Sequence, residues 1–389
     1  MISERDIETN IDNFIIDLFS EALKKRASDI HIEAFEDYGK IRFRIDGVLF
    51  EYMRLRRENY EKLITKIKLS AKVDIAEKRR PQDANLKIDQ FPDIDFRLST
   101  INTVNGEKLV LRILSINEFK KTNNLLGFSK DSIEKIEQSL NKKSGMIIFS
   151  GPTGSGKTTS LYSLLNKLNT GYENIITVED PVEYKIEGIN QVPINPKIGL
   201  TFDTALRSIL RQDPDIIMIG EIRDKETAEI AIRAAITGHL VLTTVHTKDA
   251  LSSIVRLKDL GVDDYLINAS ISLLASQRLI RKLCACKRED SLSDEEYEFI
   301  KNYKDIERNQ VIFRPNGCEK CKNGYIGREA IAEVLVIDEE LRNILRYQDT
   351  EEIKEKLKND NFKSMLATGI DKVLGGVTSL DEVIRAVDI

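Results

Sequence analysis

Apolar residues in the central part of the chain follow two alternating patterns. Short continuous apolar runs have the length of buried strands, and the segments between them carry apolar residues at helical spacing. The runs predict strands at 146–150, 175–179, 191–194, 215–219 and 240–245, and the helical stripes predict helices at about 157–169, 203–212, 224–237, 249–259 and 263–280. Apolar strands that alternate with helices predict an α/β domain with a largely parallel sheet, covered on both faces. Ligands of such sheets bind beyond the carboxyl ends of the strands.

The first third of the chain, residues 1–115, has a different rhythm. Helical stripes cover 7–25 and 59–71, and polar and apolar residues alternate in several short segments between and after them. The alternation predicts strands at 27–33, 40–46, 48–53, 84–90, 93–100 and 105–114, with turns at Asp46-Gly47 and Asn105-Gly106. These residues are therefore predicted to form a small mixed α/β domain.

Polar residues at 116–128 predict a linker into the second domain, 129–389. A helix that is capped by Ser129 is expected directly after the linker. Four short helices are expected within 338–389, where the sequence indicates packing and no chemistry.

A glycine-rich loop follows the first strand of the second domain and precedes a helix. It matches the pattern G-x-x-x-x-G-K-[ST] of phosphate-binding loops, in the strand-loop-helix context that the motif needs. Lys157 is expected to reach the β- and γ-phosphates of a nucleotide, and the Thr158 hydroxyl is placed for Mg²⁺. The predicted binding residues are Gly151, Pro152, Thr153, Gly154, Ser155, Gly156, Lys157, Thr158 and Thr159.

Two later strands of the same domain end in carboxylates, Glu179 and Glu221. An apolar strand that delivers a carboxylate beside a phosphate loop is the Walker B arrangement, which can hold Mg²⁺ or orient the attacking water. A helix cap or a solvated strand end is the alternative for each glutamate. The presence of both downstream of one loop favours the catalytic interpretation.

Histidines and arginines leave more than one interpretation open. His239 and His246 bracket the strand at 240–245, where they could sense a γ-phosphate or be structural. Arg97 and Arg112 lie on strands of the first domain, and from the sequence alone solvated strand faces are the favoured explanation.

The four cysteines come in two pairs, Cys284 with Cys286 and Cys318 with Cys321. Four thiolates at this spacing predict a structural Zn²⁺ site. Four reduced thiols without metal are the alternative. The charged segment between the pairs predicts a solvated finger over 283–325 that the metal closes.

Composition narrows the class of partner and the compartment. The chain has 389 residues and a net charge of −5, so no overall basic field indicates nucleic acid as a main partner. No stretch approaches 18 uninterrupted apolar residues, and the N-terminus is polar rather than a signal peptide. We therefore expect a cytoplasmic protein that reaches a membrane only through a partner.

Taken together, the motifs resemble the ATPases of type II secretion and type IV pilus assembly, of the GspE/PilB type. The resemblance covers nearly the whole chain. Besides the glycine loop and the two-histidine segment, it is carried by 27–33, 42–47, 74–83, 106–112, 178–184, 210–215, 220–224, 277–279, 317–321 and 324–328.

This resemblance implies a homohexameric, Mg²⁺-dependent ATPase with a RecA-like core. It would sit beneath the platform protein of the inner membrane and drive the addition of pilin subunits. The resemblance implies that Glu179 is the general base and that Glu221 lies near Mg²⁺. It also implies that Arg97 and Arg112 cross to a nucleotide, which replaces the interpretation as solvated charges.

The resemblance also leaves alternatives. Many members of the family carry a further N-terminal domain, and this chain is expected to be a short form that begins at the next one. The cysteine finger favours assembly over retraction, and the short N-terminus resembles the competence pseudopilus branch. A nucleic-acid translocase and a nucleotide-gated scaffold without turnover are the more distant alternatives.

Overall fold

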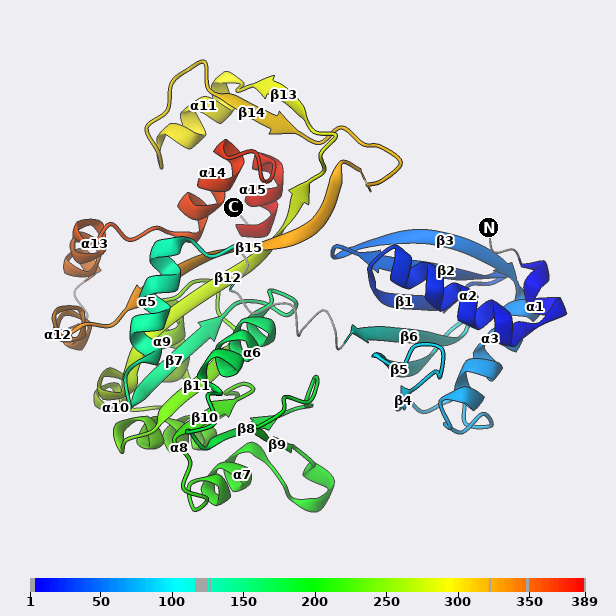
Figure 1. Cartoon of the computed structure of the whole chain (residues 1–389), viewed down its shortest axis with the longest axis horizontal. Coiled ribbons are helices and arrows are strands. Elements are labelled where there is room, and N and C mark those ends of the chain that lie inside the picture. Colours follow the sequence, from blue (N-terminus) through cyan, green and yellow to red (C-terminus); the bar gives the residue numbers. More distant parts are fainter. Residues whose placement is uncertain (1–3, 116–124, 126, 322, 348–349, 388–389) are drawn as a thin grey trace. The chain divides into compact units, whose positions relative to one another are not determined.

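The computed structural model describes residues 4–115, 125, 127–321, 323–347 and 350–387. The chain divides into two compact units, Met1–Lys121 and Thr122–Ile389 (Figure 1). The linker predicted at 116–128 lies outside the described residues, apart from 125, 127 and 128.

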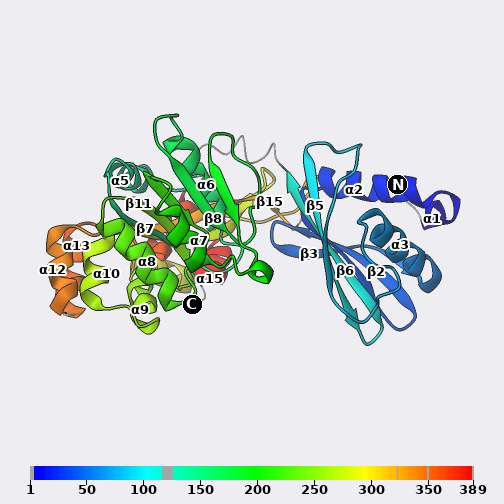
Figure 2. The ribbon, with the colours of Figure 1, turned by 90° about the horizontal axis from the view of Figure 1, so that it is seen from below.

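The described part of the first unit is a six-stranded antiparallel sheet with helices on one face (Figure 2). Ile30 and Ile32 face the helices and share their core, so Asp29, His31 and Glu33 point to the opposite face of the sheet. The helices are α1 (Arg5–Thr9), α2 (Ile11–Lys24) and α3 (Arg57–Ser70), and the strands are β1 (Ala27–Ala34), β2 (Tyr38–Ile45), β3 (Val48–Arg56), β4 (Gln82–Leu86), β5 (Ile94–Thr103) and β6 (Gly106–Ser115), in the spatial order β3-β2-β1-β6-β5-β4.

The single helix predicted over 7–25 is divided in two by Asn10. The backbone of Asn10 is extended, and its side chain accepts hydrogen bonds from the N–H groups of Asp12 and Asn13. Asparagine is a strong N-cap because its side chain satisfies N–H groups that the first helical turn leaves unpaired. The cap therefore starts α2 within an apolar stripe that is continuous in sequence.

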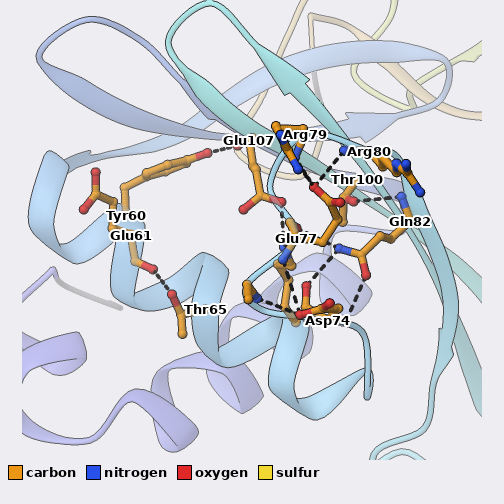
Figure 3. A network of polar contacts seen from close by, with 12 residues as sticks. Tyr60, Glu61, Thr65, Asp74, Glu77, Arg79, Arg80, Gln82, Thr100 and Glu107 are labelled. Atoms are coloured by element: carbon orange, nitrogen blue, oxygen red, sulfur yellow. Dashed lines mark hydrogen bonds and ion pairs between the residues drawn. The ribbon is translucent and has the colours of Figure 1, made fainter.

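A polar network fixes the loop between α3 and β4 (Figure 3). The Gln82 amide spans the loop: it accepts from the Asp74 N–H and donates to the carbonyls of Asp74 and Glu77. The ammonium of Lys68, which is 1% exposed, donates to the Glu77 carbonyl at 2.8 Å and to Glu107 Oε1 at 2.7 Å. Side chains thus hold a loop that has no regular secondary structure.

The second unit is built on a seven-stranded sheet within the part that the structure describes. Its strands run parallel except for the last one in sequence, which is the antiparallel edge strand. They are β7 (Gly145–Ser150), β8 (Ile175–Glu179), β9 (Asn190–Pro193), β10 (Ile216–Ile219), β11 (Leu240–Val245), β12 (Ile271–Leu283) and β15 (Tyr325–Val336), in the order β15-β12-β7-β11-β10-β8-β9.

Helices cover both faces of this sheet, because strands such as β7 carry apolar side chains on both faces. Met146 and Ile148 belong to one core cluster, whereas Ile147 and Phe149 belong to another. The first cluster lies under α7 (Phe202–Ile209), α8 (Lys225–Ile236), α9 (Ser252–Asp259) and α10 (Asp264–Ser270), and the second under α5 (Lys130–Leu140) and α6 (Lys157–Leu168); a short 3₁₀ turn, η1 (Pro196–Ile198), precedes α7. The predicted α/β class with a P-loop core is confirmed.

The helix predicted over 263–280 is wrong for its second half. The helix α10 ends at Ser270, and the chain continues as β12, which pairs with β7 on one side and with β15 on the other. Leu273, Leu274 and Ala275 are fully buried. A continuous apolar run of this kind does not distinguish a buried strand from a buried helix.

The segment between the cysteine pairs forms a small layer of its own, and it is not the fully solvated finger that its charge predicts. Ile300 and Ile312 from this segment are buried in one cluster with Ile370 and Val383 from the C-terminal helices. The elements are β13 (Arg288–Ser291), α11 (Asp294–Lys301) and β14 (Val311–Arg314), followed after β15 by α12 (Glu339–Tyr347), α13 (Thr350–Asn359), α14 (Met365–Leu374) and α15 (Leu380–Val387). The four helices expected within 338–389 are present.

Candidate nucleotide site

The glycine loop leaves β7 at Ser150 and enters α6 at Lys157. Gly151 and Gly156 have φ angles of +145° and +90°, which strongly favour glycine. A Cβ atom on Gly151 would lie 2.5 Å from the carbonyl oxygen of Gln277, so the loop also has no room for a side chain there. The loop backbone therefore packs closely against β12. It also lies at the positive end of a 12-residue helix, which is a favourable place for an anion.

Lys157 is folded into the loop and is only 8% exposed. Its ammonium donates to the carbonyls of Gly151 at 2.8 Å and Pro152 at 3.0 Å. Burial lowers the pKa of Lys157 to about 8; the carboxylate of Glu221 opposes this shift, and the cationic Arg278 adds to it. The structure thus brings the charge of Glu221 within reach of the predicted phosphate-binding lysine.

Glu221 is the centre of a charged cluster at the end of β10. It forms an ion pair with Arg223, and its Oε2 lies 3.4 Å from His246 Nε2. Arg223 also approaches Asp180 Oδ2 at 3.5 Å. Burial lowers the pKa of His246, as does the charge of Lys157, while Glu221 opposes the shift. His246 and Glu221 therefore share the surroundings of the glycine loop.

Glu179 ends the neighbouring strand β8 and is 3% exposed. Its carboxylate accepts hydrogen bonds from the hydroxyls of Tyr162 and Thr177 and from Gln191 Nε2. Tyr162 lies on α6, so Glu179 is linked directly to the helix that carries the loop lysine. Burial, and next the charge of Glu179, raise the pKa of the Tyr162 phenol.

His239 lies at the other end of β11 from His246. Its ring nitrogen Nδ1 is 3.0 Å from the Ala234 carbonyl, and its own carbonyl accepts from Gly145 N at the start of β7. Six strand residues separate the histidines, which is roughly 20 Å at the usual rise. Within one chain, the structure therefore places His239 away from the glycine loop, and its contact with a nucleotide stays a prediction.

Arg97 and Arg112 are direct cross-strand partners in β5 and β6 of the first unit. Arg112 Nε lies 3.2 Å from Asp29 Oδ1, and its side chain is 59% exposed. The two arginines therefore share the face of the sheet that carries no helices. Their predicted contact with a nucleotide stays a prediction.

The four cysteines meet at one point of the second unit. Their sulfur atoms all lie within 4.8 Å of one another. The Sγ–Sγ distances are 3.9 Å for Cys284 and Cys318, 3.7 Å for Cys286 and Cys321, and 3.6 Å for Cys318 and Cys321. Sulfurs around a tetrahedral Zn²⁺ are roughly 3.8 Å apart, given Zn–S bonds of about 2.3 Å. The donor set and its spacing fit zinc, the tight C-x-C pair included.

Two residues that contact the glycine loop or act on its lysine through their charge received no role from the sequence. The amide of Gln277 contacts the loop at Ser155 and the first turn of α6 at Ser160, and the charge of Arg278 acts on Lys157. Both lie on β12, the strand that periodicity assigned to a helix. The motif at 277–279 was part of the family resemblance, and this was the available signal.

Comparison with known proteins identifies the family of the chain. The family model described as Type II/IV secretion system protein matches residues 4–385. The chain belongs to this family. It is 43% identical over 371 residues to the type II secretion system protein E of Dickeya dadantii (strain 3937), covering 95% of this chain and 74% of that protein. It is 44% identical over 384 residues to the type IV pilus assembly ATPase PilB of Acinetobacter baylyi, covering 97% and 66%.

Solved structures of the same fold include a pilus motor. The pilus retraction motor PilT with bound ADP superposes with a TM-score of 0.65 at 27% identity, covering 95% of this chain and 96% of that one. The ATPase DotB of Legionella pneumophila superposes with a TM-score of 0.67 at 22% identity, covering 96% and 94%, and shows the fold alone. Among the described residues, no helix is both long and apolar enough to cross a bilayer.

Proposed function

We propose that this chain is a Mg²⁺-dependent motor ATPase that powers the assembly of a type IV pilus or of a type II secretion pseudopilus. The observation that carries the proposal is the convergence of Lys157, Glu221 and His246 at the end of a parallel sheet, beside a glycine loop that opens a helix. Relatives that are named as secretion and pilus assembly ATPases support it.

The chain's own residues divide the work of ATP hydrolysis. The loop N–H groups and Lys157 bind the phosphates, and the ammonium exchanges its two loop carbonyls for phosphate oxygens. The Thr158 hydroxyl and Glu221 are the residues that would hold Mg²⁺, which supplies charge to offset the developing negative charge on the phosphates. Glu179 would accept the proton of the attacking water, and His246 would hydrogen-bond a phosphate oxygen.

Arginines of the first unit would complete the site. An arginine that belongs to a separate compact unit makes hydrolysis depend on how that unit closes over the nucleotide. Arg97 and Arg112 are adjacent on one sheet face, so a single approach would bring both to the phosphates. ATP binding and release would then move one unit relative to another.

The assembly that we propose is a homohexamer on the cytoplasmic face of the inner membrane, docked to the platform protein of its system. Zn²⁺ held by Cys284, Cys286, Cys318 and Cys321 would close the segment from 283 to 325. Retraction is a second candidate because the pilus retraction motor PilT shares the fold at 27% identity.

The direct test is ATP turnover by the purified chain with Mg²⁺ or with EDTA. We expect phosphate release that EDTA abolishes and that Lys157→Ala lowers by at least about a hundredfold, because the lysine contacts the phosphates that change charge. Far-ultraviolet circular dichroism checks that the variant is folded. Wild-type protein that binds ATP but shows no turnover, even with its membrane partner, would favour the scaffold instead.

A further inference from the structure

The side chain of Gln277 bridges the phosphate loop and the helix that follows it. Its Nε2 donates to the Ser155 carbonyl at 2.7 Å, and its Oε1 accepts from the Ser160 hydroxyl at 2.9 Å. Gln277 is 1% exposed and lies on β12, one residue beyond the last pair between this strand and β7. One amide therefore joins the tip of the loop, the first turn of α6 and the neighbouring strand.

We infer that Gln277 is a positioning residue that holds the Ser155–Gly156 peptide in the orientation that nucleotide binding needs. The inference rests on the proposed function, because it names what keeps the same loop in its binding geometry. It assigns no chemical step to Gln277, which acts through the backbone of the loop.

Peptide planarity determines the direction of the Gly156 N–H group. In a trans peptide the C=O and the N–H point in opposite directions. The hydrogen bond from Gln277 fixes the Ser155 carbonyl toward β12, so the N–H of Gly156 must point away from β12. Gly156 has a φ of +90°, and glycine tolerates both signs of φ, so this peptide has little intrinsic resistance to flipping. A flipped peptide would place a carbonyl oxygen where an anion needs an N–H.

The amide orientation of Gln277 follows from its partners. A backbone carbonyl can only accept, so the end that faces Ser155 must be the NH₂ group. The Ser160 hydroxyl then donates to the oxygen at the other end, which keeps the amide from rotating. The backbone of Gln277 adds a steric limit, because its carbonyl oxygen lies 2.5 Å from the position of a Cβ on Gly151. Strand β12 therefore contacts the loop at its beginning and near its end.

Two variants separate positioning from simple packing. Gln277→Glu keeps the shape but replaces the donor with an oxygen that repels the Ser155 carbonyl, and Gln277→Met keeps the volume without hydrogen bonds. We measure the Kd values of ADP and AMP by competition against a fluorescent ATP analogue. We expect the ADP Kd to rise about tenfold or more in both variants, as the loss of a buried hydrogen bond predicts, with the AMP Kd within about twofold of wild type. AMP lacks the β-phosphate that the loop binds.

Controls keep this inference apart from the proposed function. The control Ser272→Ala removes a buried hydroxyl of β12 that donates to the Met146 carbonyl, away from the loop. This variant should bind both nucleotides as wild type does. Lys157→Ala should lose ADP binding; if it does not, the proposed function fails whatever Gln277 does. An ADP Kd within about twofold of wild type in both Gln277 variants would overturn the inference, and so would equal losses of ADP and AMP affinity.

Discussion

Glu179 ends β8, and Glu221 follows the end of the neighbouring parallel strand β10, but their surroundings differ. Glu179 is buried and receives hydrogen bonds from Tyr162, Thr177 and Gln191. Glu221 instead lies among charged groups, where it pairs with Arg223 and His246 and acts on Lys157. The fixed geometry of Glu179 suits a general base that must accept a proton from one positioned water molecule. The charged surroundings of Glu221 suit a residue that lies beside a metal ion and phosphates.

These surroundings predict different defects for the two amide variants. Glu179→Gln should bind ATP normally and lower kcat by at least about a hundredfold at every Mg²⁺ concentration, because the proton acceptor is lost. Glu221→Gln should raise the Mg²⁺ concentration needed for half-maximal turnover. Phosphate release over a Mg²⁺ titration distinguishes the two. Unchanged turnover in Glu179→Gln would remove it as the base.

Glu33 on the open face of the first sheet gives a pH-dependent prediction. Burial would raise its pKa, but hydrogen bonds and charge from Arg42 and Lys108 outweigh burial and hold the pKa at about 2, below the ordinary 4.5. Folding therefore favours the ionised form. The ionised Glu33 therefore stabilises the folded state fully above about pH 5, and this contribution is lost as the pH falls toward 2.

We expect Glu33→Gln to lower the local stability of β1 at pH 7 by about 2 kcal/mol, and the difference from wild type to shrink as the pH falls from about 5 toward 2. Amide hydrogen exchange of β1 in the full chain measures this. The matched control is Glu36→Gln, in the exposed turn after β1, which should have little effect at any pH. A deficit that stays constant down to pH 2 would contradict the prediction.

The sequence predicted the residues whose position follows from a strand end or from local spacing. The glycine loop, both glutamates and the paired cysteines are of this kind. The histidines differ because β11 runs parallel to β7: His246 follows the carboxyl end of β11, where the loop lies, and His239 precedes the other end. The rule that ligands bind beyond the carboxyl ends of parallel strands therefore separates the two, although their spacing alone does not. Gln277 could not be found this way, since its partners Ser155 and Ser160 lie more than a hundred residues away in sequence.

At the scale of elements, the sequence predicted the alternating strands and helices of the second unit but missed β12, β15 and the elements β13, α11 and β14 between the cysteine pairs. The apolar residues of β12 satisfy a helical pattern as well as a strand pattern. What makes the segment a strand is its position between β7 and β15, and periodicity does not report long-range pairing. Local capping decided the other difference, at Asn10, where a side chain ended one helix and began another.

The cysteine cluster belongs to this scale because a metal ion would join the two loops that carry the cysteine pairs, one after β12 and one before β15. We expect about one Zn²⁺ per chain by elemental analysis, since four thiolates complete a tetrahedral site. Cys318→Ser should remove it and increase proteolytic cleavage within 283–325, while the buried contacts of Ile300 and Ile312 keep the segment partly folded. Folded wild-type protein without bound metal would contradict the site.

For the whole molecule, the question is which chain supplies the arginines. In the homohexamer that we propose, Arg97 and Arg112 would serve the site of a neighbouring subunit. Arg97→Ala should then be inactive with little loss of ATP affinity, because an arginine supplied in trans acts mainly on the transition state.

Mixing inactive variants tests this arrangement. Lys157→Ala keeps both arginines but lacks a working loop, and Arg97→Ala keeps the loop. If subunits exchange and mix at random, about a quarter of the sites in an equal mixture combine an intact loop with an intact neighbouring arginine. We expect ATP turnover to recover to roughly that level. A wild-type rate of ATP turnover for Arg97→Ala alone would show that Arg97 takes no part in hydrolysis.

The order of strands in the second sheet has a consequence during synthesis on the ribosome. The strand β7, which carries the glycine loop, pairs with β12, and β12 has its other edge covered by β15, which ends at Val336. Most of the chain must therefore leave the exit tunnel before the nucleotide site is enclosed, whereas the first sheet is complete once β6 has emerged. A nascent chain arrested before β15 presents the bare edge of β12 to its surroundings, and that edge is where chaperones or neighbouring nascent chains would bind.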